Sequence, residues 1–203
     1  MKRLIFLLIV LFSLSCSKNK INLDYKTLSS YSIITQDKSK YIADSLNVYL
    51  KKSFGIKLPV ESNIKKNNYI HLKYDSKVKE DFISFKFSEN AITILANNNK
   101  MLAYGVYDFL EKYFGIRWYS TDFTLIPKLK EIEIPLIKEI IYKPPVTTRT
   151  VHSRLFYKDF SFADKLKVSN EAFPNYVPNA RVHTFHRFMP FEKFYLDHPE
   201  YYA

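Results

Sequence analysis

Two similar helix ends constrain the fold of this chain most strongly. The sequence has only three glycines, and two of them, Gly55 and Gly115, stand in the closely similar stretches KSFGIKLP and KYFGIRWY. A glycine directly after a helical pattern is typical of a left-handed C-terminal cap. Strand-like residues follow each glycine, and Pro59 prevents further helix after the first. We therefore expect two helices that each stop at a glycine. Shared capping chemistry, rather than a duplication, accounts for the likeness.

The segments around these glycines alternate between strand and helix patterns. The expected elements, in chain order, are a strand at 31–35, a helix from Asp37 or Ser39 through Phe54, a strand at 69–73, a β-hairpin within 81–97, a helix from Asn97–Asn99 to Gly115 and a closing strand at 131–135. This order predicts an α+β fold, a small β-sheet with two helices packed on one face. The domain is expected to span residues 31–143, and YKPP at 142–145 is expected to be a linker.

Composition excludes a disordered chain and argues against a nucleic-acid partner. Hydrophobic residues make up 47% of the chain, with 17 Phe and 16 Tyr, so a packed core is readily built. The formal net charge is +11, but the lysines are scattered along the chain. Nucleic-acid binders usually carry clustered basic residues. We interpret the charge as a solvated surface; a basic membrane-surface binder has only the net charge to support it.

The N-terminus has the pattern of an export signal. Met1–Arg3 is basic, Leu4–Phe12 is uninterruptedly apolar and too short to span a bilayer, and Cys16 follows Ser13, Leu14 and Ser15. This arrangement resembles the lipobox of bacterial lipoproteins, although Leu is commoner where Ser13 stands. We expect a signal peptide at 1–15, lipidation of Cys16, a tether at 16–30 and an exported, membrane-anchored lipoprotein, in the outer membrane with a periplasmic or surface face. The alternative is a buried cysteine within an ordinary signal peptide.

The stretch from residue 97 to 135 carries a family resemblance. Its motifs are Ala103–Tyr107, Phe109–Glu111, Gly115–Tyr119 and Pro127, with Gly55–Val60 upstream. Together they resemble the accessory α+β domain that precedes the catalytic barrel in family 20 glycoside hydrolases and in α-glucuronidases. The resemblance spans residues 30 to 143. Gly105 in mid-helix also indicates that the sheet approaches the helix backbone closely. Trp118 is interpreted as core packing, with a sugar-stacking platform as the alternative.

The residues after the linker resemble the start of a barrel. PPVTTRTVHSR is similar to the first strand of the barrel that follows the accessory domain. RVHTFHRFMPFEKFYLDHPEYYA resembles an early barrel segment in a glycosidase-like family of bacterial lipoproteins with no settled function, in which the chain continues past a His-Pro-Glu-Tyr motif. Residues 144–203 are therefore expected to begin an incomplete (β/α)₈ barrel, because a whole barrel needs about 200 residues or more.

The resemblance implies two substrate-binding candidates, Arg149 and His183. In family 20 enzymes an arginine at the end of the first barrel strand hydrogen-bonds the terminal sugar; a structural ion pair is the alternative for Arg149. His183 and His186 have a spacing that suits metal ligands, but no third ligand completes the pattern, so neither a metal nor a cofactor is expected.

The catalytic residues remain unknown. Glu192, Asp197 and Glu200 are interpreted as solvated residues or helix caps.

These patterns support two candidate functions. In the first, the chain is the N-terminal part of a lipid-anchored, glycoside hydrolase-like protein acting on polysaccharide or oligosaccharide, and is inactive by itself. In the second, it is a non-catalytic surface lipoprotein that binds carbohydrate or a partner. Both place the chain at a membrane through Cys16.

Overall fold

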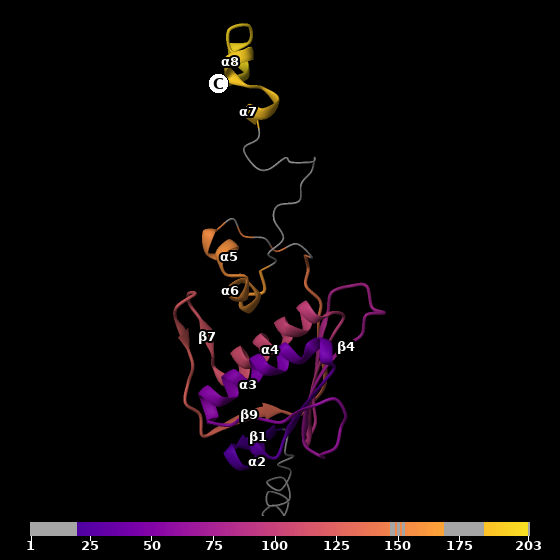
Figure 1. Ribbon diagram of the computed structural model, residues 1–203. Coiled ribbons are helices and arrows are strands. Elements are labelled where there is room, and N and C mark those ends of the chain that lie inside the picture. The colour runs from indigo at the N-terminus through magenta and orange to yellow at the C-terminus, as the bar shows by residue number, and fades with distance from the viewer. Residues whose placement is uncertain (1–19, 147–148, 150, 152, 169–184, 203) are drawn as a thin grey trace, which may run out of the picture.

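The computed structural model describes residues 20–146, 149, 151, 153–168 and 185–202 (Figure 1). The expected signal peptide, the lipidation candidate Cys16 and the substrate-binding candidate His183 lie outside the described residues.

A six-stranded mixed sheet forms one layer of the domain, in the order β10-β5-β6-β4-β2-β3. Its strands are β2 (Ser32–Thr35), β3 (Val60–Glu61), β4 (Tyr69–Tyr74), β5 (Ile83–Phe87), β6 (Ala91–Ala96) and β10 (Ile137–Tyr142). The pairs β3–β2, β2–β4 and β4–β6 are parallel, whereas β5 pairs antiparallel with β6 and β10. The expected hairpin is the β5–β6 pair, in which a three-residue polar turn joins two alternating runs.

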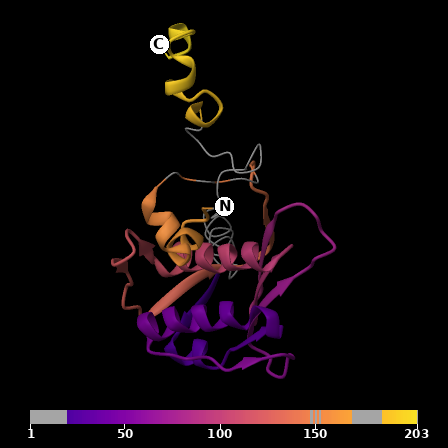
Figure 2. The same cartoon turned by 45° about the horizontal axis from the view of Figure 1, so that its top comes forward.

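Two long helices cover one face of this sheet, which confirms the expected α+β fold. Helix α3 (Lys40–Phe54) follows a short 3-10 turn, η1 (Asp37–Ser39), and α4 (Asn99–Phe114) lies beside it (Figures 1 and 2). The side chain of Asn98 caps α4 by accepting a hydrogen bond from the Met101 amide at 2.9 Å. Gly55 and Gly115 end the two helices with φ of 76° and 67°, as their sequence context predicts.

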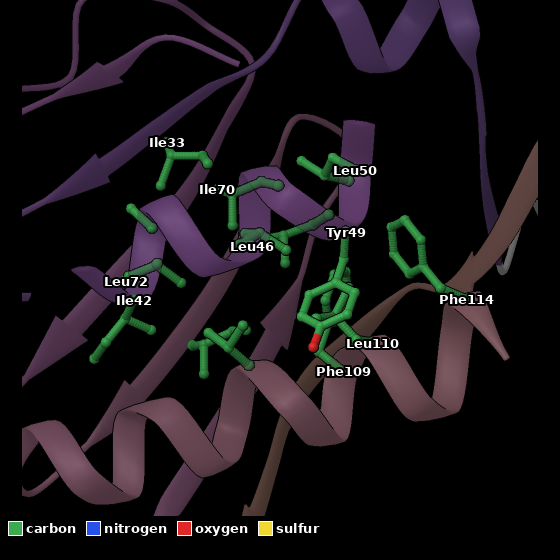
Figure 3. Close-up of a cluster of buried hydrophobic side chains, with 14 of the residues drawn as sticks. Ile33, Ile42, Leu46, Tyr49, Leu50, Ile70, Leu72, Phe109, Leu110 and Phe114 are labelled. Carbon is green, nitrogen blue, oxygen red and sulfur yellow. The ribbon is translucent and has the colours of Figure 1, made fainter. Parts of the chain in front are cut away.

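The core lies between the sheet and these helices. Figure 3 shows side chains from both layers meeting there; they are Ile33, Ile70 and Leu72 from the strands, Ile42, Leu46, Tyr49 and Leu50 from α3, and Phe109, Leu110 and Phe114 from α4. In β4 and β6 the buried residues alternate with half-buried or exposed ones, so each strand gives one face to the helices.

Gly105 is the point of closest approach between α4 and the sheet. A Cβ atom at this position would lie 2.8 Å from Cγ2 of Ile94 and 2.9 Å from Cγ2 of Ile83. Both isoleucines are buried, so a methyl group added at Gly105 would have to displace their side chains within the core. The absence of a side chain at Gly105 therefore sets the spacing of the two layers.

Residues 20–30 differ from the expected tether. Lys20–Asp24 forms strand β1, and Tyr25–Ser29 forms the short helix α2. The reason is the burial of Leu23 and Leu28, whose apolar side chains join the core. Strand β1 pairs antiparallel with β9 (Glu131–Pro135), so β9 does not close the main sheet as the sequence suggested. Strand β10 closes it instead.

The remaining elements are short. They are β7 (Arg117–Trp118), β8 (Thr124–Leu125), α5 (Arg154–Lys158), α6 (Phe160–Lys165), α7 (Phe185–Phe188), α8 (Phe191–Phe194) and η2 (Pro199–Tyr202). The described residues of 144–168 contain two helices; the expected first barrel strand falls on a stretch in which 147–148, 150 and 152 lie outside the described residues, so it stays a prediction. Within the described ranges, no helix is both long and apolar enough to cross a membrane.

We expect Gly105→Ala to destabilise the domain. The added methyl group favours helix by about 1 kcal/mol, but overpacking a tight core costs about 1–3 kcal/mol. Urea unfolding followed by circular dichroism should therefore show a net loss of roughly 1 kcal/mol. In an Ile94→Ala background the same substitution should cost less, because one close contact is gone. Equal costs in both backgrounds would contradict the close approach.

Gly55→Ala provides the matched control. Gly55 has a φ of 76° and no atom within 4 Å of a Cβ placed there, so the substitution strains only the backbone. Its cost should be the same with Ile94 or Ala at position 94.

Candidate functional site

Arg149, the substrate-binding candidate that the structure describes, lies against helix α4. Its Nε donates a hydrogen bond to the Lys167 carbonyl at 3.1 Å, and its Nη1 donates to the Val146 carbonyl at 2.7 Å. The guanidinium carbon lies 5.7 Å from the centroid of the Tyr104 ring, a cation–π distance. The guanidinium thus bonds the backbone at Val146 and at Lys167 while it packs on the Tyr104 ring of α4. Its contact with a sugar stays a prediction.

Tyr104 makes the second connection between α4 and the following segment. Its ring is buried, and its hydroxyl donates to the Val168 carbonyl at 3.2 Å. Burial, followed by the nearby charge of Asp164, raises the pKa of Tyr104 to about 12, although Arg149 acts in the opposite direction. The hydroxyl therefore stays protonated at neutral pH and remains a donor.

Helix α6 completes the attachment. Asp159 caps α6 by accepting from the Phe162 amide at 2.9 Å, while Phe162 and Ala163 are buried. Lys167 ends the helix with a φ of 59°, and its ammonium group forms an ion pair with Asp108 on α4. We call Arg149, Phe162, Ala163, Lys167 and Val168 the α4 anchor. It fixes the described part of the segment after the linker onto the helix that carries the resemblance motifs.

A pocket of about 320 Å³ lies next to the α4 anchor. Helix α4, strands β5 and β10, and Lys167 form its walls. The lining residues are Ile83, Phe85, Asp108, Phe109, Lys112, Tyr113, Ile140, Tyr142 and Lys167. Aliphatic and aromatic side chains form most of this surface, and the charged groups are two lysines and one aspartate. An apolar concavity with a few polar groups is the usual form of a small-molecule site.

The sequence alone does not reveal this pocket. Asp108 and Lys112 are four residues apart, so helical periodicity places them on one edge of α4. Lys167 reaches the same place only through the turn after α6, and Tyr142 only through the pairing of β10 with β5. Neither long-range contact has a local sequence signal.

Trp118 belongs to the core and not to a sugar platform. Its side chain is only 6% exposed. The indole Nε1 donates to the Tyr49 hydroxyl at 2.9 Å, and the rings of Tyr49 and Tyr107 contact it edge-on, with centroids 5.7 and 5.4 Å away. The face that a sugar would need is therefore occupied by protein.

The carboxylates near the C-terminus show no sign of a catalytic acid. Glu192, Asp197 and Glu200 are exposed. Hydrogen bonds from the Glu200 backbone amide and from His198 lower the pKa of Glu200, whereas a general acid needs a raised pKa. Burial raises the pKa of Asp164 on α6, and the nearby charge of Lys100 opposes this shift.

Histidine and acidic side chains do not gather into a metal site in the part of the chain that the structure describes: it holds no group of three or more His, Cys, Asp or Glu residues suited to a metal ion. His186 lies on α7 and His198 pairs with Glu200 at 3.0 Å.

This chain has limited similarity to known families and solved structures. Residues 118–203 match a family described as "Domain of unknown function (DUF4838)". No curated protein matches.

Solved structures match this chain at low sequence identity. The GH20 β-N-acetylhexosaminidase from Streptomyces coelicolor A3(2) matches with a TM-score of 0.49 and 13% identity, over 65% of this chain and 25% of that one. The GH20 exo-β-N-acetylglucosaminidase from Vibrio harveyi matches at 0.44 and 17%, over 66% and 18%. A family GH115 4-O-methyl-α-glucuronidase matches at 0.47 and 13%, over 64% and 19%. The chain therefore spans a quarter or less of each of these proteins.

We expect Arg149→Ala to loosen the α4 anchor. The substitution removes two hydrogen bonds from a charged donor, each worth about 1.5–3 kcal/mol when fully formed. Because the guanidinium is partly exposed, a loss of about 1–2 kcal/mol in local stability is more realistic, which corresponds to roughly 5- to 30-fold faster cleavage. Limited chymotrypsin digestion within residues 155–162 measures this rate.

Lys143→Ala is the control for this experiment. Lys143 forms an ion pair with Glu80 at 2.9 Å in which the two side chains are 64% and 76% exposed. Such a pair contributes little stability, so the cleavage rate should stay within about twofold of the parent chain. Equal acceleration by both substitutions would show that Arg149 has no special part in the attachment.

Proposed function

We propose that this chain is the N-terminal portion of a lipid-anchored, glycoside hydrolase-like protein that acts on polysaccharide or oligosaccharide outside the cytoplasm. Residues 20–142 form its accessory domain. The hydrolytic groups belong to a later part of the protein, and the role of the accessory domain is to hold that part in place.

The α4 anchor is the observation that carries this proposal. Helix α4 contains Ala103–Tyr107 and Phe109–Glu111, the motifs that resemble the accessory domain of family 20 enzymes and α-glucuronidases. Within these motifs, Gly105 faces the sheet, Tyr107 contacts Trp118, and Tyr104 bonds the segment after the linker. The same helix therefore packs the accessory domain and attaches the segment after the linker, as a supporting domain requires.

A non-catalytic carbohydrate-binding lipoprotein is the second candidate. The pocket beside the α4 anchor favours it, because a small concave site lined by aromatic side chains needs no catalytic carboxylates to bind a ligand. The two candidates differ in hydrolysis, which only the first requires of the protein.

Activity assays separate the two candidates. The full chain, purified in mild detergent, should release no 4-nitrophenol from aryl hexosaminides or aryl glucuronides above the rate in buffer, because glycoside hydrolysis generally needs two positioned carboxylates. The product of the whole source reading frame, read through codon 203 to its own stop, should hydrolyse at least one of them. Turnover by the 203-residue chain itself would contradict the proposal. A stop directly after Ala203 would favour the second candidate.

Lipid anchoring is tested at Cys16. Expressed in a bacterial host with radiolabelled palmitate, the chain should incorporate label and sediment with membranes. Cys16→Ser should abolish the label, because the acylated thiol is missing. Equal labelling of the parent chain and the Cys16→Ser variant would refute the anchor.

A further inference from the structure

We propose that the pocket between α4, β5 and β10 binds a single six-membered ring that carries a carboxylate. This goes beyond the supporting role proposed for the domain. The size, apolar walls and charges of the pocket are the basis for proposing a carboxylated ring. Its identification as a uronic acid unit of a glycan, rather than a free aromatic acid, rests on the proposed function.

The walls of the pocket suit the flat face of a ring. Ile83, Phe85 and Phe109 are buried and form an apolar floor. The ring of Tyr113 lies 5.3 Å from that of Phe109, and the tilted pair continues the floor toward the surface. Tyr142, at 46% exposure, lines the pocket from β10, where it pairs with Ile83 of β5. Aromatic and aliphatic surfaces of this kind pack against the apolar face of a ring.

The volume limits the occupant to one small group. About 320 Å³ lies at the lower end of the range for small-molecule sites. A single ring with its substituents suits a site of this size, whereas an extended oligosaccharide would have to leave most of its units outside.

The charges at the pocket favour an anion. Lys167 is already paired with Asp108, so these two groups nearly neutralise each other. Lys112 has an exposed side chain whose ammonium lies 5.6 Å from the Tyr113 ring centroid, and among the described residues it forms no ion pair. One positive charge is therefore left beside the aromatic wall, where a carboxylate on a stacked ring would meet it. Asp108 can also accept a hydrogen bond from a ring hydroxyl.

Ligand-observed saturation-transfer NMR on the full chain in mild detergent tests the proposal. The probes are sodium D-glucuronate, sodium benzoate and D-glucose at matched ionic strength, with detergent micelles alone as the blank. We expect at least one carboxylated ring to saturate the site below about 50 mM, since weak single-ring ligands bind in the millimolar range. D-glucose should bind at least about fivefold more weakly.

Two variants locate the binding in the pocket. Lys112→Met should weaken binding of the carboxylated ring about tenfold, as loss of a charged hydrogen bond predicts, and Lys112→Arg should restore most of it. Tyr142→Ala should weaken every ring ligand, because it removes one wall. Lys57→Met, at an exposed lysine outside the pocket, should change nothing.

The outcomes are distinct. Binding of glucuronate that depends on Lys112 supports the site and a glycan ligand. Binding of benzoate alone, with the same dependence, supports the carboxylated-ring site and overturns the sugar identification. Equal binding of D-glucose, an unchanged affinity in Lys112→Met, or no saturable binding overturns the proposal. None of these results bears on the supporting role of the domain, which the reading-frame and hydrolysis experiments test separately.

Discussion

The close contact between α4 and the sheet at Gly105 is the constraint on which the rest of the structure depends. With no side chain between them, the helix backbone rests on Ile94 and Ile83. This position brings Tyr107 against Trp118 on one side of α4, and leaves Tyr104 and Asp108 where the segment after the linker can reach them. A helix displaced from the sheet would lose both sets of contacts and would widen the pocket above Ile83.

Features determined by nearby residues could be predicted from the sequence. Glycine after an amphipathic run predicted both helix ends, and alternating residues around a polar turn predicted the β5–β6 hairpin. The pairing of β1 with β9 joins residues more than a hundred positions apart, and no local pattern signals it. Strand β10 was missed because Lys138 and Glu139 interrupt its alternation, and its register shifts between Ile137 and Ile140.

Only two residues of the candidate site, Gly105 and Arg149, could be identified from the sequence. The mid-helix glycine indicated a close approach, and Arg149 stood out through its motif. One hydrogen-bond partner of Arg149 is the carbonyl of Lys167, in a turn eighteen residues later. Lys167 has a left-handed backbone conformation there, and because it is not a glycine the sequence does not predict this turn. Two interpretations of Trp118 were open. The hydroxyl of Tyr49, sixty-nine residues away, accepts a hydrogen bond from the indole N–H and so identifies Trp118 as a core residue. The pocket is lined by side chains from segments that are far apart in the sequence. Its lining residues could therefore be identified only from the structure.

Strand β1 begins at Lys20, and this start has a geometric consequence for a protein anchored at Cys16. Four residues of extended chain reach only about 14 Å. An acyl group on Cys16, as proposed, would therefore moor the domain close to the lipid headgroups by the end that holds β1, β9 and α2. Figure 1 shows α5 and α6 at the opposite end of the domain. The length of the folded domain, rather than that of a flexible linker, would then set the distance between the bilayer and the part of the protein that follows.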